Sequence, residues 1–157
     1  MNDIKKLIRR SEIIQHRAEI EIFNLAELKK EQEKIKCTLE LRLISLKNNL
    51  FIINREICNI ENKAQLFEFI RKRAIFNYKL NEVNTQIKEI HKIIEVTQQK
   101  LEAQQKKKIF WYKKEEKYKI WRQWERNELL KKELISEENE QEETEIVKKY
   151  KRSQYQY

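Results

Sequence analysis

The chain has 157 residues, contains neither glycine nor proline, and carries a formal net charge of +9 from 35 Lys and Arg against 26 Asp and Glu. Without glycine it has no ready residue for turns with positive φ, for Gly-rich phosphate loops, for dinucleotide fingerprints or for nucleophile elbows. Charged residues make up 39% of the chain, which favours long helices that bury one apolar stripe over a globule with a thick core. We therefore expect an all-α protein of one domain whose partners are acidic.

The first part of the chain carries an apolar repeat with the spacing of a coiled coil. Its positions are Ile4, Leu7, Ser11, Ile14, Ala18, Ile22, Leu25, Leu28, Gln32, Ile35, Leu39, Leu43, Leu46, Leu50, Ile53, Ile57 and Ile60. Their mean spacing is 3.5 residues, the period of a left-handed coiled coil. The repeat predicts a first helix over about residues 3–59, roughly 80 Å long.

A turn is expected at about residues 59–62. Asn62 can accept a hydrogen bond as the N-cap of a second helix, with Gln65 able to reach back as in a capping box. Asn59 is a candidate to end the first helix in the left-handed backbone conformation, a position where glycine is usual. Because no strong helix breaker stands here, the alternative is one continuous helix of about 130 residues in a homodimeric coiled coil.

The second helix is expected over about residues 63–136. Its clearest seam is Leu80, Val83, Ile87, Ile90, Ile94, Thr97 and Leu101, preceded by Leu66, Ile70 and Ala74. A turn centred near residue 61 pairs residues whose numbers sum to about 122, which places Ser11 opposite Trp111. Residues 137–157 form an acidic block followed by a basic one, and such blocks predict a frayed, flexible charged tail.

A basic and aromatic segment occupies residues 100–132, with 12 Lys and Arg against five Glu. All three tryptophans lie in it, within the 14 residues from Trp111 to Trp124. Trp111 and Tyr118, seven residues apart, fit the seam, whereas Trp121 and Trp124 lie at or beyond the end of the first helix and favour a partner contact. The same segment also fits a binder of single-stranded nucleic acid or of an anionic membrane surface, which is the alternative function.

The hairpin tip carries a second aromatic group, formed by Phe67, Phe69, Phe76 and Tyr78 with Ile70. This surplus over what a seam needs fits either a tip-closing core or a docking surface, and Arg71-Lys72-Arg73 adjoins it.

The sequence offers no catalytic, metal-binding or cofactor-binding constellation. His16 and His91 have no ligand at metal spacing, and Cys37 and Cys58 are too far apart along one helix to bridge. No nucleophile stands beside a base, and a rod has no pocket that excludes water. We therefore expect no enzyme and no cofactor. The charged N-terminus and the lack of an apolar run of about 18 residues predict a cytosolic protein.

Two motifs resemble those of a known family. Trp111, Lys114, Glu115, Tyr118 and Trp121 form W-x-x-K-E-x-x-Y-x-x-W, similar to the C-terminal signature of the InvI branch of the SctO/YscO family, the stalk proteins of type III secretion. The I-K-x-L-x-R-R segment from Ile4 to Arg10 resembles the start of the same proteins, and the resemblance extends over about residues 4–146.

This resemblance implies a cytoplasmic antiparallel two-helix coiled-coil hairpin, similar to flagellar FliJ and in shape to the γ stalk of rotary ATPases. Such proteins bind the hexameric secretion ATPase with the end that carries both termini, link it to the export gate at the inner membrane, and include some that bind secretion chaperones. On this basis the candidates for ATPase contact are Lys5, Arg9, Arg10, Trp111, Lys114, Tyr118, Trp121 and Trp124. The candidates for contact with the export gate or another partner are Phe67, Phe69, Ile70, Arg71, Phe76 and Tyr78. We expect a monomer in isolation and no nucleic-acid partner.

Overall fold

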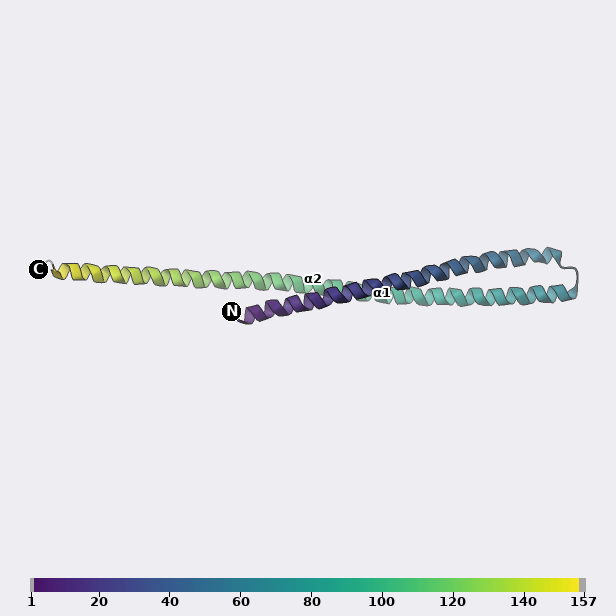
Figure 1. The fold of residues 1–157 in the computed structure, drawn as a ribbon, viewed down its shortest axis with the longest axis horizontal. Helices are drawn as coiled ribbons and strands as arrows, with labels where there is room; N and C mark the ends of the chain where they lie inside the picture. Colours follow the sequence, from purple (N-terminus) through teal and green to yellow (C-terminus); the bar gives the residue numbers. More distant parts are fainter. Residues whose placement is uncertain (1, 156–157) are drawn as a thin grey trace. The chain divides into compact units, whose positions relative to one another are not determined.

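The computed structural model describes residues 2–155, which form an all-α helical hairpin with no strand among them. Helix α1 spans Asn2–Arg55, the short 3-10 helix η1 spans Glu56–Asn59, and α2 spans Lys63–Tyr155 (Figure 1). The described residues divide into two compact units. Among the described residues, unit 1 consists of residues 2–17 and 108–155, and unit 2 of residues 18–107.

The buried side of α1 follows a strict alternation of four- and three-residue steps. Its positions are 4, 8, 11, 15, 18, 22, 25, 29, 32, 36, 39, 43, 46, 50 and 53, all buried or half-buried. The sequence-based seam is wrong at Leu28, Ile35 and Ile57, which are exposed, whereas Lys29 and Lys36 lie half-buried. Long lysine stems can cover apolar surface while their ammonium groups reach polar partners. Here Lys29 Nζ donates to Gln98 Oε1 at 2.7 Å, and Lys36 Nζ lies 3.4 Å from His91 Nδ1.

Helix α2 has a matching heptad seam that uses other residues near the tip than expected. Phe69 and Phe76 turn inward, whereas Leu66, Ile70 and Ala74, which we expected in the seam, are exposed. From Phe76 onward every seam position through 125 is buried or half-buried. Val83 is the most completely buried apolar side chain of unit 2, with the buried Ile90 seven residues further on.

The turn combines a predicted cap with an unexpected helix end. Asn62 Oδ1 accepts the Gln65 N–H and Gln65 Oε1 accepts the Glu61 N–H, both at 2.9 Å, which confirms the capping pair. The prediction for Asn59 is wrong, because no described residue has positive φ. Instead α1 tightens into η1, and Ile60 follows in extended conformation with φ −80° and ψ 120°.

The hairpin register differs from the expected one by about five residues. Hydrogen-bonded pairs across the hairpin include Lys29 with Gln98, whose numbers sum to 127, and Gln15 with the Trp111 carbonyl, whose numbers sum to 126. The expected sum was 122, with Ser11 opposite Trp111. A 3-10 helix rises about 2.0 Å per residue and extended chain about 3.3 Å, against about 1.5 Å in an α-helix. The connection at residues 56–62 therefore carries the chain past the end of α1, and the first turn of α2 is exposed.

Helix α2 continues to Tyr155, although the sequence predicts a second helix that ends near residue 136. Residues 137–155 are rich in Glu, Gln and Lys, which favour helix, and contain no glycine or proline. Every side chain from residue 131 to 155 is exposed, so no tertiary contact supports this part of the helix. Its flexibility stays a prediction.

Candidate partner-binding site

An exposed aromatic stripe lies on α2 in unit 1. Trp121 is 50% exposed and Trp124 is 59% exposed. Together with Lys114, Lys117, Tyr118 and Ile120 they line a shallow groove of about 460 Å³. The spacing of three or four residues places these side chains on one side of the helix. The stripe offers apolar rings flanked by ammonium groups.

The other two aromatic candidates are anchored in the hairpin seam. Trp111 is half-buried, packs edge-to-face against Phe110 with ring centroids 5.6 Å apart, and accepts a 3.3 Å hydrogen bond from Gln15 at its backbone carbonyl. Tyr118 is half-buried, and its exposed part reaches the groove. Lys114 Nζ lies 5.5 Å from the centroid of the Phe110 ring, which directs its ammonium group along the aromatic surface.

A buried carboxylate fixes this part of α2 against α1. Glu115 is 7% exposed, accepts a hydrogen bond from Gln15 Nε2 at 2.5 Å, and pairs with Lys119 Nζ at 2.9 Å. The hydrogen bond from Lys119 lowers the pKa of Glu115 below its ordinary value, burial opposes this, and the bond from Gln15 adds to it. The same contact with Glu115 raises the pKa of Lys119. Polar seam residues of this kind specify register in coiled coils, because every other register leaves them unpaired.

The sequence did not predict this contact between Gln15 and the buried Glu115. Glu115 entered the sequence analysis only as part of the family motif, and the expected seam contained Ile14 and not Gln15. The signal was the repeat that runs from Ile4 through Ile8 instead of Leu7, which reaches Gln15 instead of Ile14.

Basic side chains gather on the first turns of α1, also in unit 1. Lys6, Arg9, Arg10 and Arg17 surround Ile13 and Ile14 along a shallow groove. Lys5, Arg9 and Arg10, the predicted contacts, are all exposed. The basic turns and the aromatic stripe therefore belong to the same unit.

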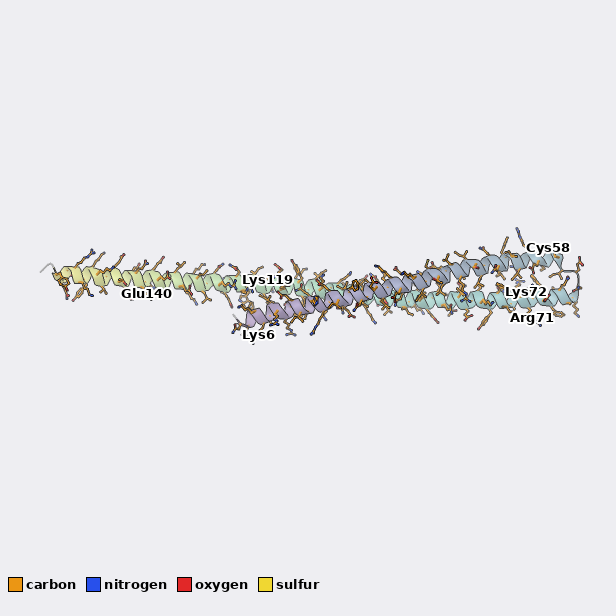
Figure 2. All side chains as sticks on the ribbon, in the orientation of Figure 1. Lys6, Cys58, Arg71, Lys72, Lys119 and Glu140 are labelled. Carbon is orange, nitrogen blue, oxygen red and sulfur yellow. The ribbon has the colours of Figure 1, made fainter. Side chains whose placement is uncertain are left out.

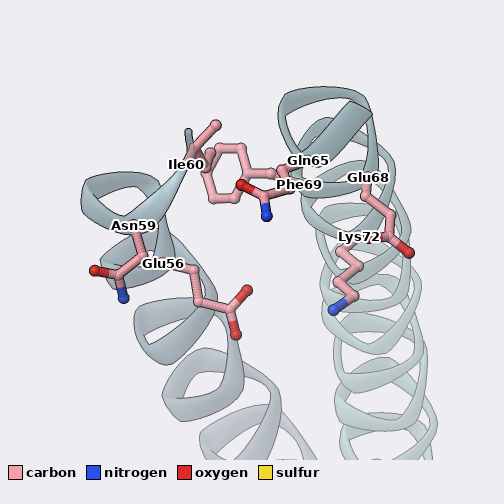
Figure 3. Close-up of a pocket in the computed structure, with 7 residues that line it drawn as sticks. All are labelled: Glu56, Asn59, Ile60, Gln65, Glu68, Phe69 and Lys72. Carbon is pink, nitrogen blue, oxygen red and sulfur yellow. The ribbon is translucent and has the colours of Figure 1, made fainter. Parts of the chain in front are cut away.

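In unit 2, the residues predicted at the tip divide into two groups. Phe69 is 7% exposed and lines, with Ile60 and Gln65, a groove between the two arms of the hairpin (Figure 3). Phe76 is half-buried. The burial of these two rings leaves less of their surface available to a partner.

Phe67, Ile70 and Tyr78 are exposed at the tip, Phe67 by 61%. Arg71 is exposed as well, and it lies beside Lys72 at the closed end of the hairpin, where Cys58 is also found (Figure 2). Among the predicted tip contacts, these four remain accessible to a partner.

Within residues 2–155, no group of three His, Cys, Asp or Glu side chains could hold a metal ion. His91 Nε2 lies 3.1 Å from Glu95 Oε1 on the same helix. No helix in the described part is long and apolar enough to cross a membrane.

Comparison with known proteins agrees with this geometry. Residues 2–144 match the family described as Salmonella surface presentation of antigen gene type M protein. The chain belongs to this family. The surface presentation of antigen M family is a type III secretion stalk family, and the match covers both helices of the hairpin, the basic N-terminal turns and the aromatic stripe. No curated protein sequence and no solved structure matches the chain significantly.

Proposed function

We propose that the protein is a stalk and coupling protein of type III secretion, of the InvI branch, that binds the hexameric secretion ATPase through unit 1 and the export gate through the hairpin tip. It acts without catalytic chemistry of its own and promotes assembly and activity of the ATPase. It resides in the cytoplasm, at the cytoplasmic face of the inner membrane when assembled, is a monomer in isolation, and has secretion chaperones as further partners.

The observation that carries this proposal is the exposed pair Trp121 and Trp124. Tryptophan is enriched at the energetic centres of protein interfaces, because a large rigid ring buries much apolar area at little cost in conformational entropy. Two such rings on one side of a helix, within a groove that Tyr118 completes, form a surface that another protein can cover.

Charge supports an acidic partner for the same unit. The groove on α1 carries four cationic side chains, Lys6, Arg9, Arg10 and Arg17, and the aromatic groove adds Lys114 and Lys117. Complementary charge accelerates association and excludes wrong partners more than it adds affinity. The ATPase surface that receives unit 1 is therefore expected to be acidic.

The test is titration of the purified ATPase with wild-type protein and with the double variant Trp121→Ala/Trp124→Ala. Loss of two interface tryptophans costs about 2 kcal/mol or more, so Kd should rise at least about 30-fold. Tyr112→Ala is the matched control, because Tyr112 is similarly exposed and lies nine residues, or 2.5 turns, before Trp121 on the opposite side of α2.

The alternative function, a nucleic-acid binder, is tested with the same variants. It predicts that single-stranded oligonucleotides bind without the ATPase and that log K falls steeply with log salt concentration. Equal ATPase affinity of wild-type protein and the double variant would refute the assignment of unit 1.

A further inference from the structure

The closed end of the hairpin, residues 51–79, exposes more apolar surface than the stretch of α2 that follows it. Eight large hydrophobic side chains are exposed in this range, against two in residues 80–107. The eight are Phe51, Ile52, Ile57, Leu66, Phe67, Ile70, Ile75 and Tyr78. A two-helix hairpin exposes some apolar side chains everywhere, but the fourfold difference sets the closed end apart from the stretch of α2 that follows it.

These side chains point in several directions. Phe51 and Ile52 lie on the two flanks of the buried seam positions Leu50 and Ile53 of α1. Phe67 lies two residues, or about 200° of helix rotation, from the inward Phe69, so it faces away from α1. A lipid headgroup layer, which can surround the tip, covers the exposed side chains on all of these sides.

Cationic groups accompany the rings. The Arg55 guanidinium carbon lies 4.7 Å from the Phe51 ring centroid, and Lys63 Nζ lies 5.9 Å from that of Phe67. Lys79 Nζ lies 5.5 Å from the Phe76 ring. With Arg71-Lys72-Arg73 the range holds six cations against Glu56, Glu61 and Glu68, a net charge of +3. Aromatic rings beside cationic heads are typical of segments that bind the interface of anionic bilayers.

The backbone of the tip is also suited to a poorly hydrated environment. Unpaired N–H groups at a helix start cost free energy when water is removed. At the start of α2, Asn62 and Gln65 satisfy the Gln65 and Glu61 N–H groups with side-chain oxygens. The tip can therefore approach a headgroup layer without leaving these donors unpaired.

We infer that the closed end of the hairpin binds the surface of an anionic phospholipid bilayer, with Phe67, Ile70 and Phe51 in the interface and the flanking Lys and Arg on lipid phosphates. The binding is peripheral, since no described helix can span a bilayer. The inference stands apart from ATPase binding, which involves unit 1. It concerns Phe67 and Ile70, two of the tip residues through which the proposed function contacts the export gate, so a bilayer and the gate exclude one another at these side chains.

The two cysteines provide matched probes for this inference. Cys58 lies at the closed end and Cys37 in α1 within the same unit, and both are exposed. An environment-sensitive fluorophore on Cys58 of the Cys37→Ser variant should shift to the blue with vesicles of phosphatidylcholine and phosphatidylglycerol, and not with phosphatidylcholine alone. The same fluorophore on Cys37 of the Cys58→Ser variant should not shift. Equal shifts at both positions, or none at Cys58, would overturn the inference.

Co-sedimentation of the full chain with the same vesicles tests the contact residues. Phe67→Glu/Ile70→Glu should weaken binding at least about tenfold, because it removes two interface anchors and adds two like charges. Phe23→Glu, at an exposed position of α1 in the same unit, is the control and should bind as wild type does. Binding that survives the tip variant and disappears with Trp121→Ala/Trp124→Ala would assign the lipid contact to unit 1 and refute the inference, whatever the outcome with the ATPase.

Discussion

Phe69 and Phe67 lie two residues apart on α2, and the structure predicts opposite consequences for their truncation. Phe69 is 7% exposed and packs at the tip beside Ile60, whereas Phe67 is 61% exposed. Burial of a phenylalanine ring contributes about 3 to 5 kcal/mol by truncation to alanine. The lower value applies to Phe69, because a solvent-accessible groove adjoins it and relieves part of the cavity cost.

Phe69→Ala should therefore lower the free energy of unfolding by about 3 kcal/mol, and Phe67→Ala by no more than about 0.5 kcal/mol. Both substitutions gain the same helix propensity, about 0.5 kcal/mol, so their difference isolates burial. For a chain of this length, 1 kcal/mol shifts Tm by about 2–4 °C, which predicts a fall of about 6–12 °C for Phe69→Ala.

Thermal and urea unfolding followed by circular dichroism at the helical band measures both variants. Equal Tm values for the two, or a larger loss for Phe67→Ala, would refute the inward orientation of Phe69 and with it the hairpin register.

Three further predictions concern the buried carboxylate, the cap and the tail. Because the pKa of Glu115 is lowered in the folded state, the ionised carboxylate contributes fully to stability above about pH 4.3, and this contribution is lost as pH falls through the folded-state pKa. Glu115→Gln should remove this acid dependence from the free energy of unfolding. Glu116→Gln, the control, should keep it. Asn62→Ala should cost about 1 kcal/mol in urea unfolding through loss of the cap, while Asn59→Ala should cost less than about 0.5 kcal/mol. Deletion of residues 137–157 should leave Tm unchanged, and amide hydrogens of 137–155 should exchange much faster than those of residues 80–107; slow exchange there would contradict a flexible tail.

The helices and the hairpin could be predicted from the sequence because apolar residues recur every 3.5 positions and no glycine or proline interrupts them. Which of two adjacent residues faces the other helix could not be predicted from the sequence. Lys29, which donates to Gln98, is half-buried where Leu28 is exposed, and Gln15, which donates to Glu115, is as half-buried as its neighbour Ile14. The residue that lies opposite on the other helix determines which neighbour turns inward. Which residue lies opposite depends on the register of the hairpin.

The register in turn depends on the turn, where local geometry is weakly encoded. The cap at Asn62 is a local signal and could be predicted. The 3-10 end of α1 and the extended Ile60 are not signalled by any residue type, and they shift the pairing by about five residues. The same shift turns Phe69 and Phe76 inward and leaves Phe67, Ile70 and Tyr78 exposed, so the sequence could place an aromatic cluster at the tip without separating core from surface.

The candidate surface of unit 1 was more readily predicted. Trp121 and Trp124 each lie one residue before a half-buried seam position of α2, at 122 and 125, so both rings stay exposed beside the seam. The family motif contains Trp111, Tyr118 and Trp121, and the structure separates two half-buried seam residues from one exposed tryptophan.

The central claim is that unit 1 contacts the secretion ATPase through the Trp121 side of α2. Site-specific photo-crosslinking in secreting cells tests it most directly, with a photoreactive amino acid introduced at Trp121 or at Tyr112 on the opposite side of the helix. The account predicts a crosslink to the ATPase from position 121 and none from position 112. Equal crosslinks from both positions, or crosslinks from 121 only to other proteins, would contradict it.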